Sequence, residues 1–169
     1  MALPRKLKHF NMFNAGESYL GQVNEITLPK LSRKMEDYIG GGMSGPVKVD
    51  HGQVEIALER KCGGMMRSVL NQYGVVTADG VQLRFAGAYQ AEDSARPEAW
   101  EIGVRGRHQE IDPGKAKKGD DTEFGVKTVC SYYKLGQNGQ TVMEFDFLGM
   151  VEIVNGEDRL AAARAIIGG

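Results

Sequence analysis

The sequence lacks the features that mark membrane-spanning, secreted and strongly charged chains. It has no apolar run near 18 residues, so neither a membrane-spanning helix nor a membrane anchor is expected. Its 169 residues include 21 basic and 22 acidic side chains, and a formal net charge of −1 gives no long-range attraction to nucleic acid or to an anionic membrane. The amino-terminal stretch, MALPRKLKHF, is basic but has neither an apolar core nor a small-residue cleavage site, so it is not expected to be a secretory signal.

Cysteine and histidine are also scarce. Cys62 and Cys130 lie far apart, each inside an expected strand, and we interpret them as reduced, buried thiols. His9, His51 and His108 have no histidine, cysteine or carboxylate at metal-ligand spacing, so no metal site is expected.

No motif for catalysis or for a cofactor is present. The glycine-rich segment Gly40–Pro46 lacks the Gly-Lys-Ser/Thr ending of a phosphate-binding loop, and the residues around Ser44 do not form Gly-x-Ser-x-Gly. The neighbouring carboxylates at 36–37 and 120–121 point apart in a strand or loop, which makes them poor acid–base pairs. We therefore expect no catalytic residue, no cofactor and no enzymatic activity.

Glycine, in contrast, is abundant. The chain has 23 glycines, roughly twice the usual share of ~7%, which favours a β-rich chain with many tight turns. The sequence predicts one mainly β domain over residues 1–169, a sandwich-like or barrel-like subunit with one flanking helix and a short C-terminal helix. Alternating apolar residues predict strands over 8–13, 17–23, 54–62, 81–89, 100–108, 123–135 and 141–147, and helical spacing predicts helices over 65–73 and 157–167.

The alternation also assigns individual side chains to the core. Along 54–62, Arg60 interrupts the inward-facing set. The expected inward residues are Val54, Ile56, Leu58 and Cys62 in that strand, and Phe124, Val126, Thr128, Cys130 and Tyr132 in the strand over 123–135.

Two Asn-Gly pairs mark turns. Asn138-Gly139 predicts a type I′ hairpin, because both residues tolerate a positive φ angle. Asn155-Gly156 is expected to break the chain before the terminal helix, with Glu157 and Asp158 in the first helical turn, where the helix dipole favours acidic residues.

Residues 30–52 are expected to form a projecting glycine-rich loop or hairpin. Residues 30–38 can be extended, but neither face of that strand is cleanly apolar, which suits an element that meets water or a partner. Four glycines and a proline within Gly40–Pro46 leave the following segment poorly fixed by its own chain. Its support is a phosphate, a ligand or another protein subunit, and the residues alone leave these alternatives open.

One basic motif stands out. Arg105-Gly106-Arg107, with Arg84 on a neighbouring strand, either contacts phosphate or forms ion pairs with Glu101, Glu110 or a neighbouring subunit. The phosphate interpretation gives an alternative function, a nucleic-acid-binding β-barrel protein with steeply salt-dependent binding.

Several short motifs share their order and spacing with a known family. They are MALPRK (1–6), TLPKL (27–31), GGM (41–43), RGR (105–107), EIDPG (110–114), SYYKL (131–135), NG (155–156) and DRL (158–160). Over nearly the whole chain, this set resembles the major tail tube proteins of contractile-tailed, P2-like bacteriophages and R-type pyocins.

The resemblance implies a structural subunit of the inner tube of a contractile tail or phage-tail-like particle. Subunits of this family form stacked hexameric rings, in which neighbouring sheets join into a closed β-barrel tube. The implied partners are other copies of the chain, the tail sheath protein, a tape-measure protein in the lumen, the baseplate hub and the tail terminator. The implied location is a virion tail or particle assembled in the bacterial host cytoplasm.

In a phage, DNA passes through the lumen without specific binding, so the lumen is expected to be net negative. In a pyocin-like particle, the tube is an envelope-piercing channel.

Under this interpretation, another subunit supports the glycine-rich loop. The apolar residues of the segment are expected to be buried anchors between subunits, and its charged residues are expected to form ion pairs there. The candidate contacts are Lys30, Leu31, Arg33, Lys34, Met35, Glu36, Asp37, Tyr38, Gly40, Gly41, Gly42, Met43, Gly45 and Pro46.

Overall fold

The computed structural model describes residues 1–168 and confirms a mainly β chain with two short helices. The alternating apolar segments form strands, and the tight glycine turns connect them. The strands are β1 (Lys6–Asn14), β2 (Glu17–Ser18), β3 (Val23–Thr27), β4 (Arg33–Tyr38), β5 (Val47–Gln53), β6 (Ile56–Cys62), β7 (Val81–Gln90), β8 (Glu98–Asp112), β9 (Phe124–Gln137), β10 (Gln140–Asp146), β11 (Val151–Val154) and β12 (Glu157–Asp158); the helices are α1 (Arg67–Leu70) and α2 (Ala161–Ile167).

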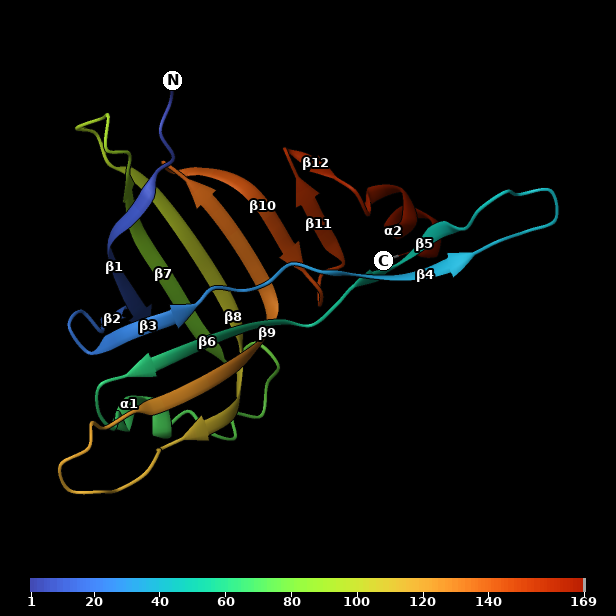
Figure 1. Ribbon diagram of the computed structural model, residues 1–169. Helices are drawn as coiled ribbons and strands as arrows, with labels where there is room; N and C mark the ends of the chain where they lie inside the picture. The colour runs from blue at the N-terminus through green and yellow to red at the C-terminus, as the bar shows by residue number, and fades with distance from the viewer. Residues whose placement is uncertain (169) are drawn as a thin grey trace.

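Two layers share the long strands β8 and β9. The main layer runs in the order β12-β11-β10-β9-β8-β7-β1-β2, and all its neighbouring strands are antiparallel. The amino-terminal half of β9 pairs with β6 instead of β10, and β6 pairs with β3. The second layer therefore lies across the first, as Figure 1 shows, and the core fills the space between them.

Gly106 and Ser131 mark the point where β8 and β9 pass from one layer to the other. Gly106 must be glycine there, because a Cβ atom would lie 1.9 Å from the carbonyl oxygen of Val129. Ser131 is an extra residue in β9, since the register skips it. This bulge reverses the alternation, so Tyr133 is buried and the expected inward position of Tyr132 is wrong.

The core is mainly apolar, and Arg60 is the most deeply buried charged residue of the described chain. Arg60 does not interrupt the inward set of β6; it occupies an inward position and is 2% exposed. Its guanidinium carbon lies 6.0 Å from the ring centre of Tyr19, and among residues 1–168 its three nitrogens have no hydrogen-bond partner. Burial lowers the pKa of Arg60. The expected inward position of Val54 is wrong, since Val54 precedes β6 and is exposed.

Three elements are shorter than the sequence predicts: the strand over 17–23, the helix over 65–73 and the terminal helix over 157–167. The strand expected over 17–23 divides into β2 and β3, because Tyr19 is buried in the core and a turn follows it. In this turn, the N–H of Gln22 donates to the carbonyl of Tyr19. The helix expected over 65–73 shrinks to α1, which leaves Met65 and Tyr73 exposed.

The expected terminal helix over 157–167 is wrong in its first turn. Asn155 and Gly156 both have positive φ angles and close a hairpin, so Glu157 and Asp158 form β12 against β11. Helix α2 begins only at Ala161. The hairpin expected at Asn138-Gly139 is confirmed, and both of its residues have positive φ angles.

Cys62 and Cys130 are free and buried, as expected. Burial raises the pKa of the Cys130 thiol to about 12. Within residues 1–168, no helix has the length and apolar character needed to cross a membrane.

Candidate assembly surface

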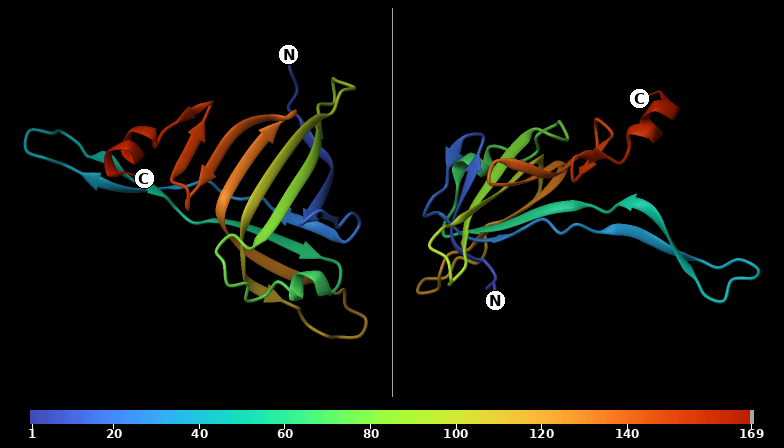
Figure 2. Two further views of the ribbon diagram at one scale, coloured as in Figure 1. Left: turned by 180° about the vertical axis from the view of Figure 1, so that it is seen from behind. Right: turned by 90° about the horizontal axis from the view of Figure 1, so that it is seen from above.

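A two-stranded hairpin projects from the layered body. Strands β4 and β5 pair only with each other, with Met35 opposite Asp50 and Tyr38 opposite Val47. Figure 2 shows this hairpin extending well beyond the body, past the carboxyl-terminal helix α2. Lys30 and Leu31 precede β4; Arg33, Lys34, Met35, Glu36, Asp37 and Tyr38 form it; and Gly40, Gly41, Gly42, Met43, Gly45 and Pro46 lie in its connecting loop.

The hairpin exposes apolar side chains on both strands. Met35 is 50% exposed and Tyr38 is 59% exposed, while Leu31, before β4, is 38% exposed. Three other exposed apolar residues, Ile39, Val47 and Val49, lie within the predicted contact segment, Lys30–Asp50, but are not among its individually named candidates. An isolated two-stranded hairpin is at best marginally stable in water, and its exposed apolar side chains make it a candidate contact surface.

The connecting loop has a turn of its own. The N–H of Met43 donates to the carbonyl of Gly40 at 3.1 Å, and the N–H of Gly40 contacts the Met43 sulfur at 3.1 Å. Gly42 has a φ angle of +86°, which favours glycine. Met43 is only partly buried by these contacts.

Charged residues of the hairpin form ion pairs within the chain. Lys48 reaches Asp37 at 2.7 Å, and Glu36 lies 4.0 Å from Lys34 and 3.5 Å from His51. The structure therefore places three expected inter-subunit ion-pair residues in local pairs on the hairpin surface.

Arg33 connects the hairpin to the body. Its Nε donates to the Asp50 carboxylate at 2.9 Å on β5, and its Nη1 donates to Glu152 Oε1 at 2.6 Å on β11. Hydrogen bonding to Asp50 raises the pKa of Arg33, and bonds from the Gly52 N–H and from Arg33 hold the pKa of Asp50 below its usual range.

A second apolar surface lies on the carboxyl-terminal arm, defined as residues 147–168. Phe147, Leu148, Ile166 and Ile167 are all exposed there, the last two at 84% and 68%. A cavity of about 290 Å³ separates this arm from the hairpin base. Sequence reasoning missed the arm as a contact surface, although the apolar pair Phe147-Leu148 in a turn between strands was a signal.

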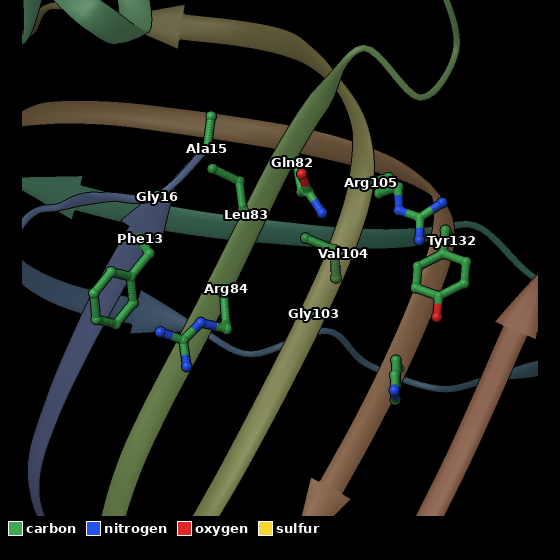
Figure 3. A pocket seen from close by; sticks show the side chains of 11 residues that line it. Phe13, Ala15, Gly16, Gln82, Leu83, Arg84, Gly103, Val104, Arg105 and Tyr132 are labelled. Carbon is green, nitrogen blue, oxygen red and sulfur yellow. The ribbon is translucent and has the colours of Figure 1, made fainter. Parts of the chain in front are cut away.

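The outer face of the main layer carries a basic cluster, shown in Figure 3. Arg84 on β7 pairs with Glu101 at 3.0 Å, which is the ion-pair interpretation offered from the sequence. Arg107 instead donates to the carbonyl of Val76 at 3.1 Å, and Arg105 stacks on a tyrosine ring. The three arginines of the expected motif therefore have different surroundings.

Histidine 108 belongs to the core. It contacts the Thr128 hydroxyl at 2.9 Å and the Gln72 side-chain oxygen at 3.1 Å, and burial lowers its pKa to about 4. Over residues 1–168, no group of three or more histidine, cysteine or carboxylate side chains is arranged to hold a metal ion.

Comparisons with known proteins agree with this arrangement. The family model described as "Phage tail tube protein FII" matches residues 4–168. The tail tube protein of Escherichia phage P2 is 46% identical over 99% of both chains, and the major tail tube protein of Serratia phage KSP20 is 37% identical over 99% of this chain and 100% of its own.

Two solved structures share the fold at only 10% identity. One is a cryo-EM structure of an extracellular contractile injection system, the PVC sheath/tube terminator in the extended state; it has a TM-score of 0.58 and covers 79% of this chain and 96% of its own. The other is the PVC sheath-tube complex in the extended state, with a TM-score of 0.57 and coverage of 79% and 91%.

Proposed function

The chain belongs to the phage tail tube protein FII family and is a structural subunit of a tail tube, and from this premise we propose how its surfaces build that tube. Copies assemble into hexameric rings, and the rings stack into the inner tube of a contractile tail or tail-like particle. The alternative of a stand-alone nucleic-acid-binding β-barrel protein is not favoured, because the matched relatives are tail tube proteins.

The observation that carries the proposal is the unsupported hairpin β4–β5. It exposes Met35, Tyr38, Ile39 and Val47, yet it pairs with no other strand of its own chain. In the tube, a neighbouring subunit covers these side chains, and Gly40–Pro46 shapes the tip for that contact. The sequence-based contact residues from Lys30 to Pro46 are thus the inter-subunit surface of one domain that spans residues 1–169.

The carboxyl-terminal arm is the second half of this contact. The arm lies apart from the hairpin tip in both views of Figure 2, and it carries exposed apolar residues of its own. Two different surfaces that bind each other produce a head-to-tail contact, and such a contact closes into a ring when the rotation between copies allows it.

The uncovered face of β1, β7, β8, β9 and β10 lines the channel. Neither helix covers this face in Figure 2, and its outward positions include small residues such as Ala86, Ala88 and Gly103. Joining such sheets around an axis removes the free strand edges that would otherwise promote aggregation.

This subunit acts mechanically and performs no catalysis. Its further partners are the tail sheath protein around the tube, a tape-measure protein inside it, and the baseplate hub and tail terminator at its ends. The tube assembles in the bacterial host cytoplasm and resides in the particle. It conducts DNA in a phage or serves as an envelope-piercing channel in a pyocin-like particle.

Electron microscopy of the purified chain tests the proposal. Wild-type protein should form hollow tubes, whereas deletion of Gly40–Gly45 and the double variant Tyr38→Ser/Ile39→Ser should give folded subunits without tubes. Val76→Ser is the matched control, because Val76 is 89% exposed on the body, and it should assemble normally. Normal tubes from both hairpin variants, with unchanged circular dichroism, would refute the role of the hairpin.

A further inference from the structure

Three cations surround a shallow pocket on the outer face of the main layer. In the strand register, Gly103 of β8 lies between Arg84 of β7 and Lys134 of β9, and Arg105 follows two residues later on the same face. With strands about 4.8 Å apart, the Arg84 and Lys134 backbones are about 10 Å from each other. The pocket has a volume of about 370 Å³, and a Cβ atom on Gly103 would meet nothing within 4 Å, so its floor is open.

Aromatic rings hold both arginines in place. The guanidinium of Arg84 lies 4.2 Å from the ring centre of Phe13, and that of Arg105 lies 4.1 Å from the ring centre of Tyr132. Figure 3 shows these two pairs on either side of the pocket. A guanidinium stacked on a ring keeps its N–H edges available, and those edges match the oxygens of a phosphate or carboxylate.

The charged residues that line the pocket are all cations, although three carboxylates lie beside it on the same face. Glu101 pairs with Arg84, but among residues 1–168 neither Arg105 nor Lys134 takes part in an ion pair. The acidic residues Glu144 and Asp146 of β10 lie opposite Lys134 and Tyr132 in the register and bound the cluster on one side.

The second layer differs in charge. Its outer pocket, of about 210 Å³, is lined by four carboxylates and two lysines, in addition to the buried Arg60. These residues are Glu25, Glu59, Glu110, Asp112, Lys61 and Lys127. The two pockets therefore differ in their lining: only cations among the charged residues on the main layer, and mostly carboxylates on the second layer.

We propose that Arg84, Arg105 and Lys134 form a contact site for the phosphate backbone of DNA that moves through the tube. The site rests on the proposed function, in which this face lines the channel. Because each guanidinium occupies one face of a ring on which a base could stack, the contact is made to phosphates without reading sequence. The expectation of a net negative lumen stands beside this proposal, in which each subunit presents a basic pocket next to Glu144 and Asp146 of β10.

Fluorescence anisotropy with the full chain and labelled 20-base-pair duplexes of two unrelated sequences tests the site. With three phosphate contacts, the logarithm of the binding constant should fall with log salt at a slope of about −2.7, which is roughly fortyfold between 50 and 200 mM salt. The variant Arg105→Gln/Lys134→Gln should reduce the slope to about −0.9. Lys61→Gln/Lys127→Gln removes the same charge from the opposite layer and should keep the wild-type slope.

Three results would overturn the site. The first is that the control variant weakens DNA binding as much as the site variant does. The second is that the protein strongly prefers one of the two duplex sequences. The third is that polyglutamate displaces the labelled duplex as well as unlabelled duplex of the same total charge does. The last result would assign the pocket to an acidic protein. Microscopy of tube formation by both variants separates this site from the proposed function. If the site variant forms tubes and binds DNA as the wild-type protein does, the DNA site is refuted and the tube proposal is not. If the wild-type protein binds DNA but forms no tubes, the tube proposal is refuted instead.

Discussion

The layered body buries its apolar residues, whereas the β4–β5 hairpin exposes them. In the body, Leu58, Val69 and Val81 are fully buried between the two layers. In the hairpin, Tyr38 and Val47 lie opposite each other and are both more than half exposed. The body is thus complete within one chain, whereas in the proposed tube another copy completes the hairpin by covering it. Variants in the two regions should accordingly separate folding from assembly.

The largest effect is expected at the point where β8 crosses between layers. Gly106→Ala places a methyl group against the Val129 carbonyl, so β8 and β9 must separate, and the free energy of unfolding should fall by about 3 kcal/mol. Gly103→Ala is the matched control on the same strand, because its methyl group enters open space, and its effect should stay within about 0.5 kcal/mol. Urea denaturation measures both. Equal stability of the two variants would show that the layers do not meet as tightly at Gly106 as the structure indicates.

A smaller effect is expected from Arg60, the most deeply buried charged residue of the described chain. Arg60 is buried without a hydrogen-bond partner among residues 1–168, so its desolvation opposes folding. Replacing a buried charge with an apolar side chain of similar size is often neutral or stabilising, so Arg60→Met should leave the free energy of unfolding unchanged or raise it by about 1–2 kcal/mol.

Arg60→Ala is the control for this variant. It removes the same charge but leaves a cavity, and it should destabilise by about 2–4 kcal/mol. If the methionine variant lost as much stability as the alanine variant, the guanidinium would have to be favourably bound inside the folded body.

Sequence patterns predict the regular strands of the body better than they predict its irregular features, the bulge at Ser131 and the buried Arg60. Alternation located most body strands because a half-buried strand repeats every two residues, and Asn138-Gly139 located a hairpin because the turn needs two positive φ angles. The side chains of β9 beyond Cys130 could not be assigned, because the bulge at Ser131 depends on how β8 and β9 meet. Arg60 was misplaced because a charge is rarely buried without a partner.

The candidate site was predicted in part. The glycines and the mixed faces of residues 30–38 indicated the projecting hairpin, since no single face could enter a core. The arm escaped notice because Ile166 and Ile167 resemble a core-facing helix edge in sequence. The link from Arg33 to Glu152 joins residues 119 positions apart, and no local pattern predicts such a contact.

That link gives the smallest expected effect, which should be confined to the hairpin. Arg33→Gln removes the charge that joins β5 to β11, so amide hydrogen exchange should become faster over Arg33–Gln53, while exchange over β7 stays unchanged. Lys48→Gln is the control, because it breaks an ion pair inside the hairpin and leaves the link to the body intact.

The bond between Arg33 and Asp50, which positions Arg33 for its contact with Glu152, should respond to acid in a defined direction. Since hydrogen bonds hold the pKa of Asp50 below its usual range, the Arg33–Asp50 bond is complete above the ordinary carboxyl pKa and is lost as pH falls through the lowered value. Wild-type hairpin exchange, corrected for the intrinsic pH dependence, should therefore rise toward that of Arg33→Gln only below about pH 4. The variant itself should show a weaker rise, because Asp50 has lost its charged partner. An identical acid response in both proteins would mean that the hairpin orientation does not depend on Arg33, and the boundary between a self-sufficient body and a partner-dependent hairpin would then lie elsewhere in the chain.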